Sequence, residues 1–538
     1  MKRMLQQLLP YLPYLGLTIL ILGPLLAPGF VLTMDLVFAP HIPWPGFVDN
    51  TFVLYATLHV LNNIVPADVL EKSLLVAALL FSGIGAHRLM KQLLAQPALG
   101  ACYAAGVFYM INPFVYTRFM SGQFAVLLGY ALVPWCVGSL LRLLRWLDWR
   151  HMLRTSAWVV AIGIASIHVY GMLVVVIGLL LAIRVWQNRR NHAYLRKAGK
   201  WLLAAAVVVC IASSYWLVPA LLGKGTIAAS VQGFDAAERS AYATVDTNGN
   251  SRVLAVLGLQ GFWADTSGLY VLPVDAVNAW RLWQLTIWLL LIFGAVVAWR
   301  RQRSMAIYFG GLGFVAVVLS LGLINDWLAQ WLPFFAGFRE PQKFVVLLAF
   351  ADSYFLGMAV ADLMGRLRRW RWLCGVPAII TCLVVGLYTP TMFWGLYGQL
   401  TPRQYPADWF AVNRMLEADP SSGKILFLPW HLYMDFRFAG RIIASPAQKF
   451  FDRPTLVSND PEFDNAKPQL YDPAKVRIGQ LLTLAAHGTA IAGQLRTLHV
   501  RYILLAKEVD WFSYGYLNRQ PGIHLATETS NLKVYKIE

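Results

Sequence analysis

The sequence predicts a polytopic α-helical membrane protein of about eleven transmembrane or partly spanning helices, followed by a C-terminal soluble α/β domain. Hydrophobic residues make up 58% of the 538 positions and charged residues only 13%, and the mean hydropathy is +0.55. These values are far from soluble averages. Several apolar runs approach the roughly 20 residues that a bilayer crossing needs. Ordinary polarity returns after about residue 398, so we assign 1–397 to a membrane domain and 398–538 to an α/β domain.

The membrane domain contains apolar runs separated by short polar connections. The first run is too long for a signal peptide and no small-residue cleavage pattern follows it, so we expect an uncleaved first helix. The 21 tryptophans are typical of membrane-interface belts. The clearest runs are Leu15 to Leu32, Trp201 to Leu222, Leu282 to Ala298, Ala306 to Ile324 and Leu373 to Phe393.

Cations outside the C-terminal region form short clusters between these runs, although the net charge of +18 also suits nucleic-acid binding. Such clusters mark cytoplasmic loops, so we expect no nucleic acid partner. The protein should then lie in the cell membrane, with a cytoplasmic N-terminus and a periplasmic or extracellular C-terminal domain. The clusters are Lys2 and Arg3; Arg88 and Lys91; Arg142 to Arg154; Arg184 to Lys200; Arg300 to Arg303; and Arg366 to Arg371.

The segment between Arg154 and Arg184 must cross twice if both ends are cytoplasmic. Two crossings of about 15 residues reach only about 22 Å each, less than a hydrocarbon core of about 30 Å. We therefore predict a short helical hairpin with its tip at Ile167 to Gly171, which places His168 and Tyr170 at an outward cavity. One long tilted helix is the alternative.

The C-terminal domain alternates strand-like and helix-like segments. It shows no Gly-rich phosphate loop, nucleophile elbow or metal-ligand cluster. We interpret it as an accessory that covers or guides an acceptor, and a purely structural role is equally open. The predicted helices are Pro406 to Leu416 and Val476 to Leu495, and the predicted strands are Lys424 to Leu428, Arg501 to Leu505, Ile523 to Thr527 and Leu532 to Ile537.

Asp35 is the main candidate for chemistry, because it follows the first apolar run at the predicted outer interface. A carboxylate there can accept a proton from an attacking hydroxyl, as a general base does. His41 and Asp49 follow in the same loop, and its prolines favour an ordered path. The alternative is an aspartate that caps a helix or marks the interface.

Two further outer segments carry polar residues. Arg339 and Lys343, on either side of Glu340, are cations where topology does not require them, and they suit a phosphate. The alternative is that they extend toward lipid headgroups. Arg118 and Gln123 belong to a predicted tight turn, Asn112 to Gln123, which needs no function.

Together these segments carry a family resemblance. The stretches Leu32 to Pro40, Asn112 to Tyr116, Gly122 and Gln123, and Leu128 to Trp135 resemble the membrane domain of arabinofuranosyltransferase-like proteins, within the GT-C class of glycosyltransferases. The resemblance covers about the first 400 residues. The chain is much shorter than arabinofuranosyltransferases and shows no carbohydrate-binding sandwich, so the sugar and the acceptor stay open.

The resemblance implies transfer of a sugar, with inversion, from a polyprenyl-phosphate carrier to a glycan, lipid or protein acceptor on the outer face. Asp35 would be the catalytic base, and Arg339, Lys343 and Arg118 would bind the lipid phosphate. The acceptor or cavity candidates are His41, Asp49, His168, Tyr170, Gln123 and Glu340.

No cofactor is required by this chemistry, and a divalent metal is an option. Asp35, Asp49 and Glu71 show no decisive coordination spacing, so we assign no metal ligand. Two other classes remain open. A transporter or flippase of lipid-linked sugars should place ionisable residues near mid-membrane in repeated halves. A non-catalytic scaffold for envelope assembly would not need Asp35.

Overall fold

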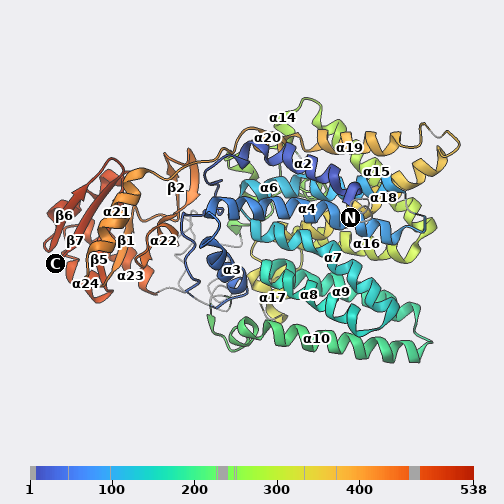
Figure 1. Cartoon of the computed structure of the whole chain (residues 1–538), viewed down its shortest axis with the longest axis horizontal. Helices are drawn as coiled ribbons and strands as arrows, with labels where there is room; N and C mark the ends of the chain where they lie inside the picture. Colours follow the sequence, from blue (N-terminus) through green and yellow to red (C-terminus); the bar gives the residue numbers. More distant parts are fainter. Residues whose placement is uncertain are drawn as a thin grey trace.

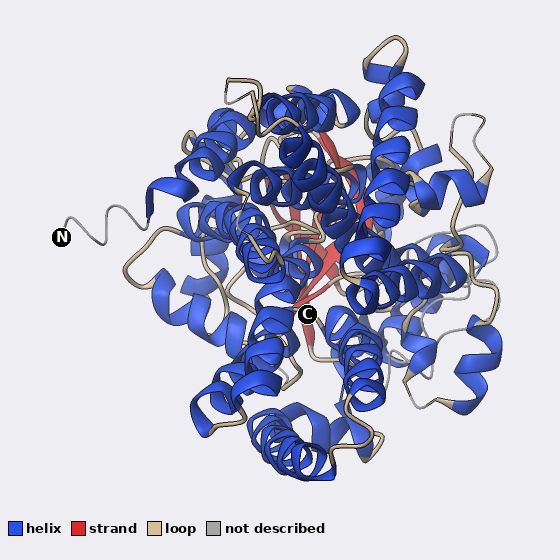
Figure 2. Ribbon diagram, turned by 90° about the vertical axis from the view of Figure 1, so that its right-hand side faces the viewer, coloured by secondary structure: helices blue, strands red, loops and turns tan. Residues whose placement is uncertain are grey.

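The fold was obtained as a computed structural model, which describes residues 8–46, 48–96, 98–225, 227, 240–247, 249, 251–332, 334–370, 372–459 and 473–538. A bundle of long helices carries the sheet domain at one end (Figure 1). Seen along the bundle from the opposite end, the strands lie behind the helices (Figure 2). We call these the sheet-domain end and the opposite end of the bundle.

The described residues contain nine helical segments long and apolar enough to cross a membrane, or ten with one bent pair. The 17-residue α8, Trp149–Ala165, is slightly shorter than these. The chain is therefore a multi-pass membrane protein, as its composition predicted. The nine are η1 with α2 and η2 (Leu9–Leu26), α4 (Ala67–Leu93), α5 with α6 (Leu99–Met120), α7 (Phe124–Trp146), α9 (Ile167–Gln187), α10 (His192–Leu221), α15 (Trp280–Arg301), α16 (Arg303–Ser320) and η5 with α18 (Pro341–Arg366).

The bent pair consists of α19, Val376–Tyr388, and the segment Pro390–Tyr397, at 77° to each other. This pair leads into the sheet domain. Shorter helices lie in the connections between spans: α3 (Phe52–Asn62), α13 (Arg252–Leu257), η3 (Trp263–Thr266), α14 (Pro273–Ala276), α17 (Asn325–Trp331) and η4 (Phe335–Gly337).

The first span begins and ends about six residues earlier than the predicted Leu15 to Leu32. Pro10 and Pro13 occupy the first turns of η1 (Leu9–Tyr11) and α2 (Leu12–Leu22), where a helix does not need the missing N–H. Gly29 then adopts φ +114°, a conformation that glycine allows. The residues before Asp35 consequently form an irregular segment outside the span.

The predicted short hairpin is present and consists of α8 and α9, joined by Ser166 alone. α8 starts just after α7, and α9 ends just before α10. Tyr194, in the first turn of α10, donates to the carbonyl of Leu144 near the end of α7 at 2.9 Å. Both open ends of the hairpin therefore lie at one end of the bundle, and the single tilted helix is wrong. The predicted tip residues instead form the first turn of α9.

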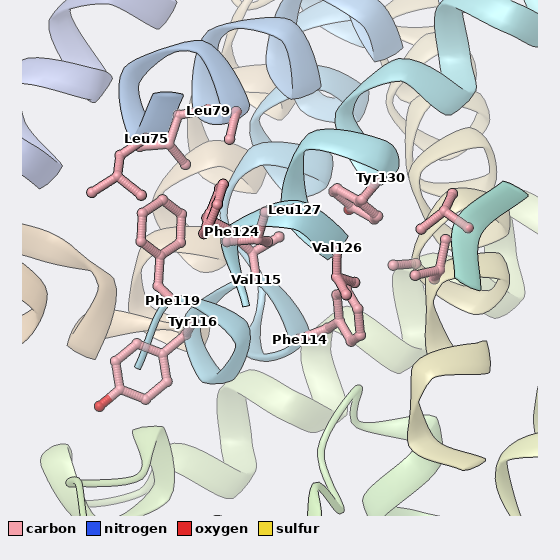
Figure 3. Packing of buried hydrophobic residues seen from close by; sticks show 14 of the residues in the cluster. Leu75, Leu79, Phe114, Val115, Tyr116, Phe119, Phe124, Val126, Leu127 and Tyr130 are labelled. Carbon is pink, nitrogen blue, oxygen red and sulfur yellow. The ribbon is translucent and has the colours of Figure 1, made fainter. Parts of the chain in front are cut away.

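A dense apolar core joins α4, α6 (Pro113–Met120) and α7. Figure 3 shows aromatic and branched residues of these helices packed together. Asn112 starts α6 because its side chain accepts from the Val115 N–H at 3.1 Å, and Pro113 takes the first-turn position. The labelled residues are Leu75, Leu79, Phe114, Val115, Tyr116, Phe119, Phe124, Val126, Leu127 and Tyr130.

The sheet domain contains a five-stranded sheet in the order β4-β1-β5-β7-β6. β4, β1 and β5 are parallel, and β7 pairs antiparallel with both β5 and β6. Each of the four predicted strands is present. The strands are β1 (Lys424–Leu428), β4 (Thr455–Leu456), β5 (Val500–Ala506), β6 (Ile523–Glu528) and β7 (Leu532–Ile537).

Side chains alternate across this sheet. Ile425 and Phe427 belong to the same core as Trp409 of α21 (Ala407–Ala418), whereas Leu426 and Leu428 pack with α23 (Pro473–Ala486) and α24 (Ala492–Thr497). The single helix predicted from Val476 to Leu495 is wrong, because Gly488 at φ +93° separates α23 from α24. The nine-residue η7, Trp511–Arg519, precedes β6.

A second, two-stranded sheet joins this domain to the bundle. It is the hairpin of β2 (Tyr433–Phe436) and β3 (Arg441–Ala444), followed by α22 (Ala447–Phe450). No strand is predicted for this stretch from the sequence. Met434, Phe436 and Ile443 are buried in the core shared with the bundle, so the hairpin is firmly anchored.

Candidate functional site

The segment that carries Asp35 lies against the turn after α6. The Asp35 N–H donates to the Ser121 carbonyl at 3.2 Å, and the Thr33 hydroxyl donates to the Met120 carbonyl at 2.6 Å. Gly122, at φ +72°, leaves the space that the backbone of residues 33 to 36 occupies. Two of the motifs identified in the sequence are thus in direct contact.

The sheet domain holds the other side of the same segment. Met34 pairs in parallel with Ile443, and its carbonyl accepts from the Ala444 N–H at 2.9 Å. Lys449 donates to the Val37 carbonyl at 2.8 Å, and the Tyr405 hydroxyl donates to the Phe38 carbonyl at 2.7 Å. Asp35 therefore lies where the two domains meet, on a backbone fixed by both.

The Asp35 side chain is exposed to solvent, and its Oδ1 accepts a hydrogen bond from the Tyr433 hydroxyl at 2.6 Å. Although solvent reaches the carboxyl, the protein packed around it removes part of its hydration and raises its pKa above the ordinary value, and the Tyr433 hydrogen bond acts in the opposite direction. Charges on Glu340, Lys343 and Arg339 also act on it, so these residues lie nearby. An accessible carboxylate with a raised pKa is suited to accept a proton.

Arg118 lies in a buried polar network beneath this surface. It is 0% exposed and donates to Gln123 Oε1 at 2.6 Å, to Glu340 Oε2 at 2.8 Å and to Gln342. Its guanidinium also lies 4.3 Å from the ring centre of Phe262. These contacts use the two terminal nitrogens of Arg118, and its role as a phosphate ligand stays a prediction.

Lys343 belongs to the same network. Its Nζ lies 2.9 Å from Glu340 Oε1 and 3.4 Å from His168 Nε2. Burial opposes the ionisation of Glu340, but Lys343 and Arg118 outweigh it and hold its pKa well below the usual range. Glu340 thus pairs with both buried cations, and the charge of Asp265 also acts on Arg118. The network also joins α6, α9 and the segment before α18.

Arg339 is the most available of the predicted phosphate ligands. It is half-buried, and its guanidinium lies 5.3 Å from the ring centre of Tyr242. Within the described ranges no carboxylate forms an ion pair with it, in contrast to Arg118 and Lys343. Its planar fork of N–H groups can therefore receive an oxyanion.

Three other predicted site residues lie elsewhere. His41 is exposed and lies near Glu417 of α21. Asp49 accepts from the N–H and hydroxyl of Thr51, at 2.8 and 2.7 Å, just before α3. Tyr170 packs edge-on against Trp216 of α10, with ring centres 5.6 Å apart. The Asp49 side chain is therefore held in a local turn with Thr51, the residue that precedes α3.

The acids considered for a metal do not come together. Glu71 is buried in α4 and accepts from the Val31 N–H at 2.9 Å, while Asp49 is occupied before α3. In the part of the chain that the structure describes, no three His, Cys, Asp or Glu side chains are arranged to hold a metal ion. The donor set does not fit a bound cation, and we derive no chemistry through one.

Tyr433, Tyr405 and Lys449 were not predicted as site residues. They come from the sheet domain, about 400 positions from Asp35, and no local spacing relates them to it. The available signal was the pair of short strand-like stretches on either side of Gly440, which favours a hairpin. Only the docking of that hairpin on Met34 brings Tyr433 to the carboxylate.

No protein-family model and no curated protein sequence matches the chain. Among solved structures it matches arabinofuranosyltransferase AftD from Mycobacteria, with a TM-score of 0.64 and 15% identity over 100% of this chain and 40% of that one. A mutant of AftD matches at TM-score 0.63 and 16% identity, over 100% of this chain and 41% of the other. Oligosaccharyltransferase AglB from Archaeoglobus fulgidus matches more loosely, at TM-score 0.44 and 12% identity over 92% and 65%.

The chain spans less than half the length of AftD. At these identities the likeness concerns the fold alone. The resemblance seen in the sequence is thus confirmed for the fold, which this chain shares with AftD.

Proposed function

We propose that this chain is a membrane glycosyltransferase that transfers a sugar from a polyprenyl-phosphate donor to a glycan, lipid or protein acceptor, with inversion. The observation that carries the proposal is the position of Asp35. A solvent-exposed carboxylate with a raised pKa is held between the two domains, near a half-exposed arginine, in a fold shared with a glycosyltransferase.

The chemistry follows from these groups. Asp35 accepts the proton of an acceptor hydroxyl as its oxygen attacks the anomeric carbon. The bond from that carbon to the phosphate oxygen breaks on the opposite face, which inverts the configuration. Arg339 binds the departing lipid phosphate with its planar fork of N–H donors. Arg118 and Glu340 hold the segment that carries Arg339 in place.

We place the sheet-domain end on the outer side of the cell membrane. Arginines at the opposite end lie over neighbouring tryptophan rings, at 4.3 to 5.5 Å from the ring centres. Tryptophans are typical of both membrane interfaces, and the clustered arginines are what favours the cytoplasmic side. The pairs are Arg145 with Trp146, Arg150 with Trp149, Arg189 with Trp186, Arg303 with Trp299 and Arg369 with Trp370.

The test is sugar transfer by the purified protein from a panel of radiolabelled polyprenyl-phosphate sugars. Asp35→Asn keeps the size of the side chain but removes the base, so we expect a loss of about 10²–10⁴-fold in kcat. Asp49→Asn, in the same loop, is the matched control and should retain transfer. Arg339→Gln should raise KM for the donor.

Full activity of Asp35→Asn would refute the assignment of the base. A transporter or a scaffold would show no transfer with any donor in the unmodified protein. A transporter would instead move labelled lipid-linked sugar across the bilayer of proteoliposomes, which a second assay on the same preparation measures.

A further inference from the structure

The sheet domain supplies the side chain that contacts the Asp35 carboxylate. The Tyr433 hydroxyl donates to Asp35 Oδ1 at 2.6 Å across 398 positions of sequence. Tyr433 is the first residue of β2, and it pairs with Ala444 at the end of β3. The Ala444 N–H in turn donates to the Met34 carbonyl at 2.9 Å. One short ladder therefore fixes both the phenol and the backbone that carries the acid.

This ladder cannot shift without disturbing the core. Met434 is 2% exposed and Phe436 and Ile443 are 0% exposed, so a change of register would expose three large apolar side chains. Burial raises the pKa of Tyr433 well above its ordinary value. The phenol consequently keeps its proton at neutral pH and acts toward Asp35 as a donor.

We propose that Tyr433 is the positioning residue of Asp35, and that the sheet domain thereby completes the active site. This inference deepens the proposed function and rests on it for the role of Asp35 as base. The hydrogen bond holds Oδ1 and directs Oδ2 toward the acceptor hydroxyl. Since a hydrogen bond to the ionised form favours that form, Tyr433 also keeps more of the base ready at lower pH.

Charged groups from the surrounding elements act on the same carboxylate. Glu340, before η5, disfavours its ionised form, and Lys343 and Arg339 favour it. Lys449 of α22 also interacts with Asp35 through its charge. None of these is changed by Tyr433→Phe, which removes one hydroxyl and leaves the ring.

A labelling experiment tests this without any substrate. A water-soluble carbodiimide with an amine activates protonated carboxyl groups, and mass spectrometry of the Asp35 peptide gives the labelling rate against pH. Tyr433→Phe should move the whole labelling curve to higher pH and increase the rate near neutral pH by about tenfold, the usual size of a hydrogen bond to a charged group.

Tyr405→Phe is the matched control, because this tyrosine also reaches the Asp35 loop but binds the Phe38 carbonyl. Its loss should lower thermal stability without moving the labelling curve. With an active donor in hand, Tyr433→Phe should lower kcat about tenfold at pH 6 and less at pH 8, with KM for the donor unchanged.

An unchanged labelling curve for Tyr433→Phe would overturn the inference. Equal shifts in both variants would also overturn it, since they would indicate general loosening of the loop. If Asp35→Asn is inactive while Tyr433→Phe behaves as the unmodified protein, the proposed function stands and only this inference fails. A shifted curve in a chain whose Asp35→Asn variant still transfers sugar would instead refute the role of Asp35.

Discussion

Gly122 allows a sharp prediction, because it lies directly under the Asp35 segment. A Cβ added there would lie 2.1 Å from the Leu36 nitrogen, 2.4 Å from the Thr33 oxygen and 2.8 Å from the Leu36 Cβ. Two of these are backbone atoms, which cannot move aside as a flexible side chain would. Gly122→Ala must therefore displace residues 33 to 36, and Asp35 with them.

The energy has two parts. An alanine in the left-handed conformation, which φ +72° requires, costs about 1–2 kcal/mol. Overpacking against a fixed neighbour adds about 1–3 kcal/mol. Gly322 distinguishes the conformational cost from the overpacking cost. It has φ +73°, but a Cβ added there would meet nothing within 4 Å. Gly322→Ala therefore carries only the conformational cost.

The free energy of unfolding, measured by denaturant titration in detergent micelles, should fall by about 1–3 kcal/mol more in Gly122→Ala than in Gly322→Ala. Sugar transfer should fall about 100-fold in Gly122→Ala alone, as expected for a misplacement near 1 Å. Equal stability of the two variants, together with normal transfer by Gly122→Ala, would refute the claim that this glycine supports the Asp35 segment.

Two further predictions concern charge. Glu340→Gln removes the carboxylate that pairs with both Arg118 and Lys343, and it should lower the free energy of unfolding by about 3–5 kcal/mol. Arg118→Met leaves a neutral Glu340–Lys343 pair and should lower it by less in the same denaturant titration. The reverse order of the two variants would contradict the network. Because Asp35 must be ionised to act as a base, kcat/KM for sugar transfer should be retained above the raised pKa of Asp35 and should decline as the pH falls through it. A kcat/KM that rises toward acid pH would contradict that role.

The membrane class and most of the sheet domain could be predicted from the sequence, because both depend on local patterns. Long apolar runs predict spans whatever their neighbours, and alternating strands such as Leu532–Ile537 predict a sheet. Errors came where one residue decides an element boundary. Proline in a first turn moved the first span, and Gly488 divided a helix.

For the candidate site, the sequence by itself determined which segments beside the spans carry polar side chains: the Asp35 loop, the stretch that holds Arg118 in α6 and the segment from Arg339 to Lys343. Only the tertiary structure decided which of these side chains are buried and which groups they pair with. Arg118 and Lys343 form ion pairs with Glu340, whereas Arg339 does not pair with Glu340. Asp35 accepts a hydrogen bond from Tyr433, which lies about 400 residues away in the sheet domain. The physical reason is that burial and pairing depend on contacts between distant segments, which no local pattern of residues encodes.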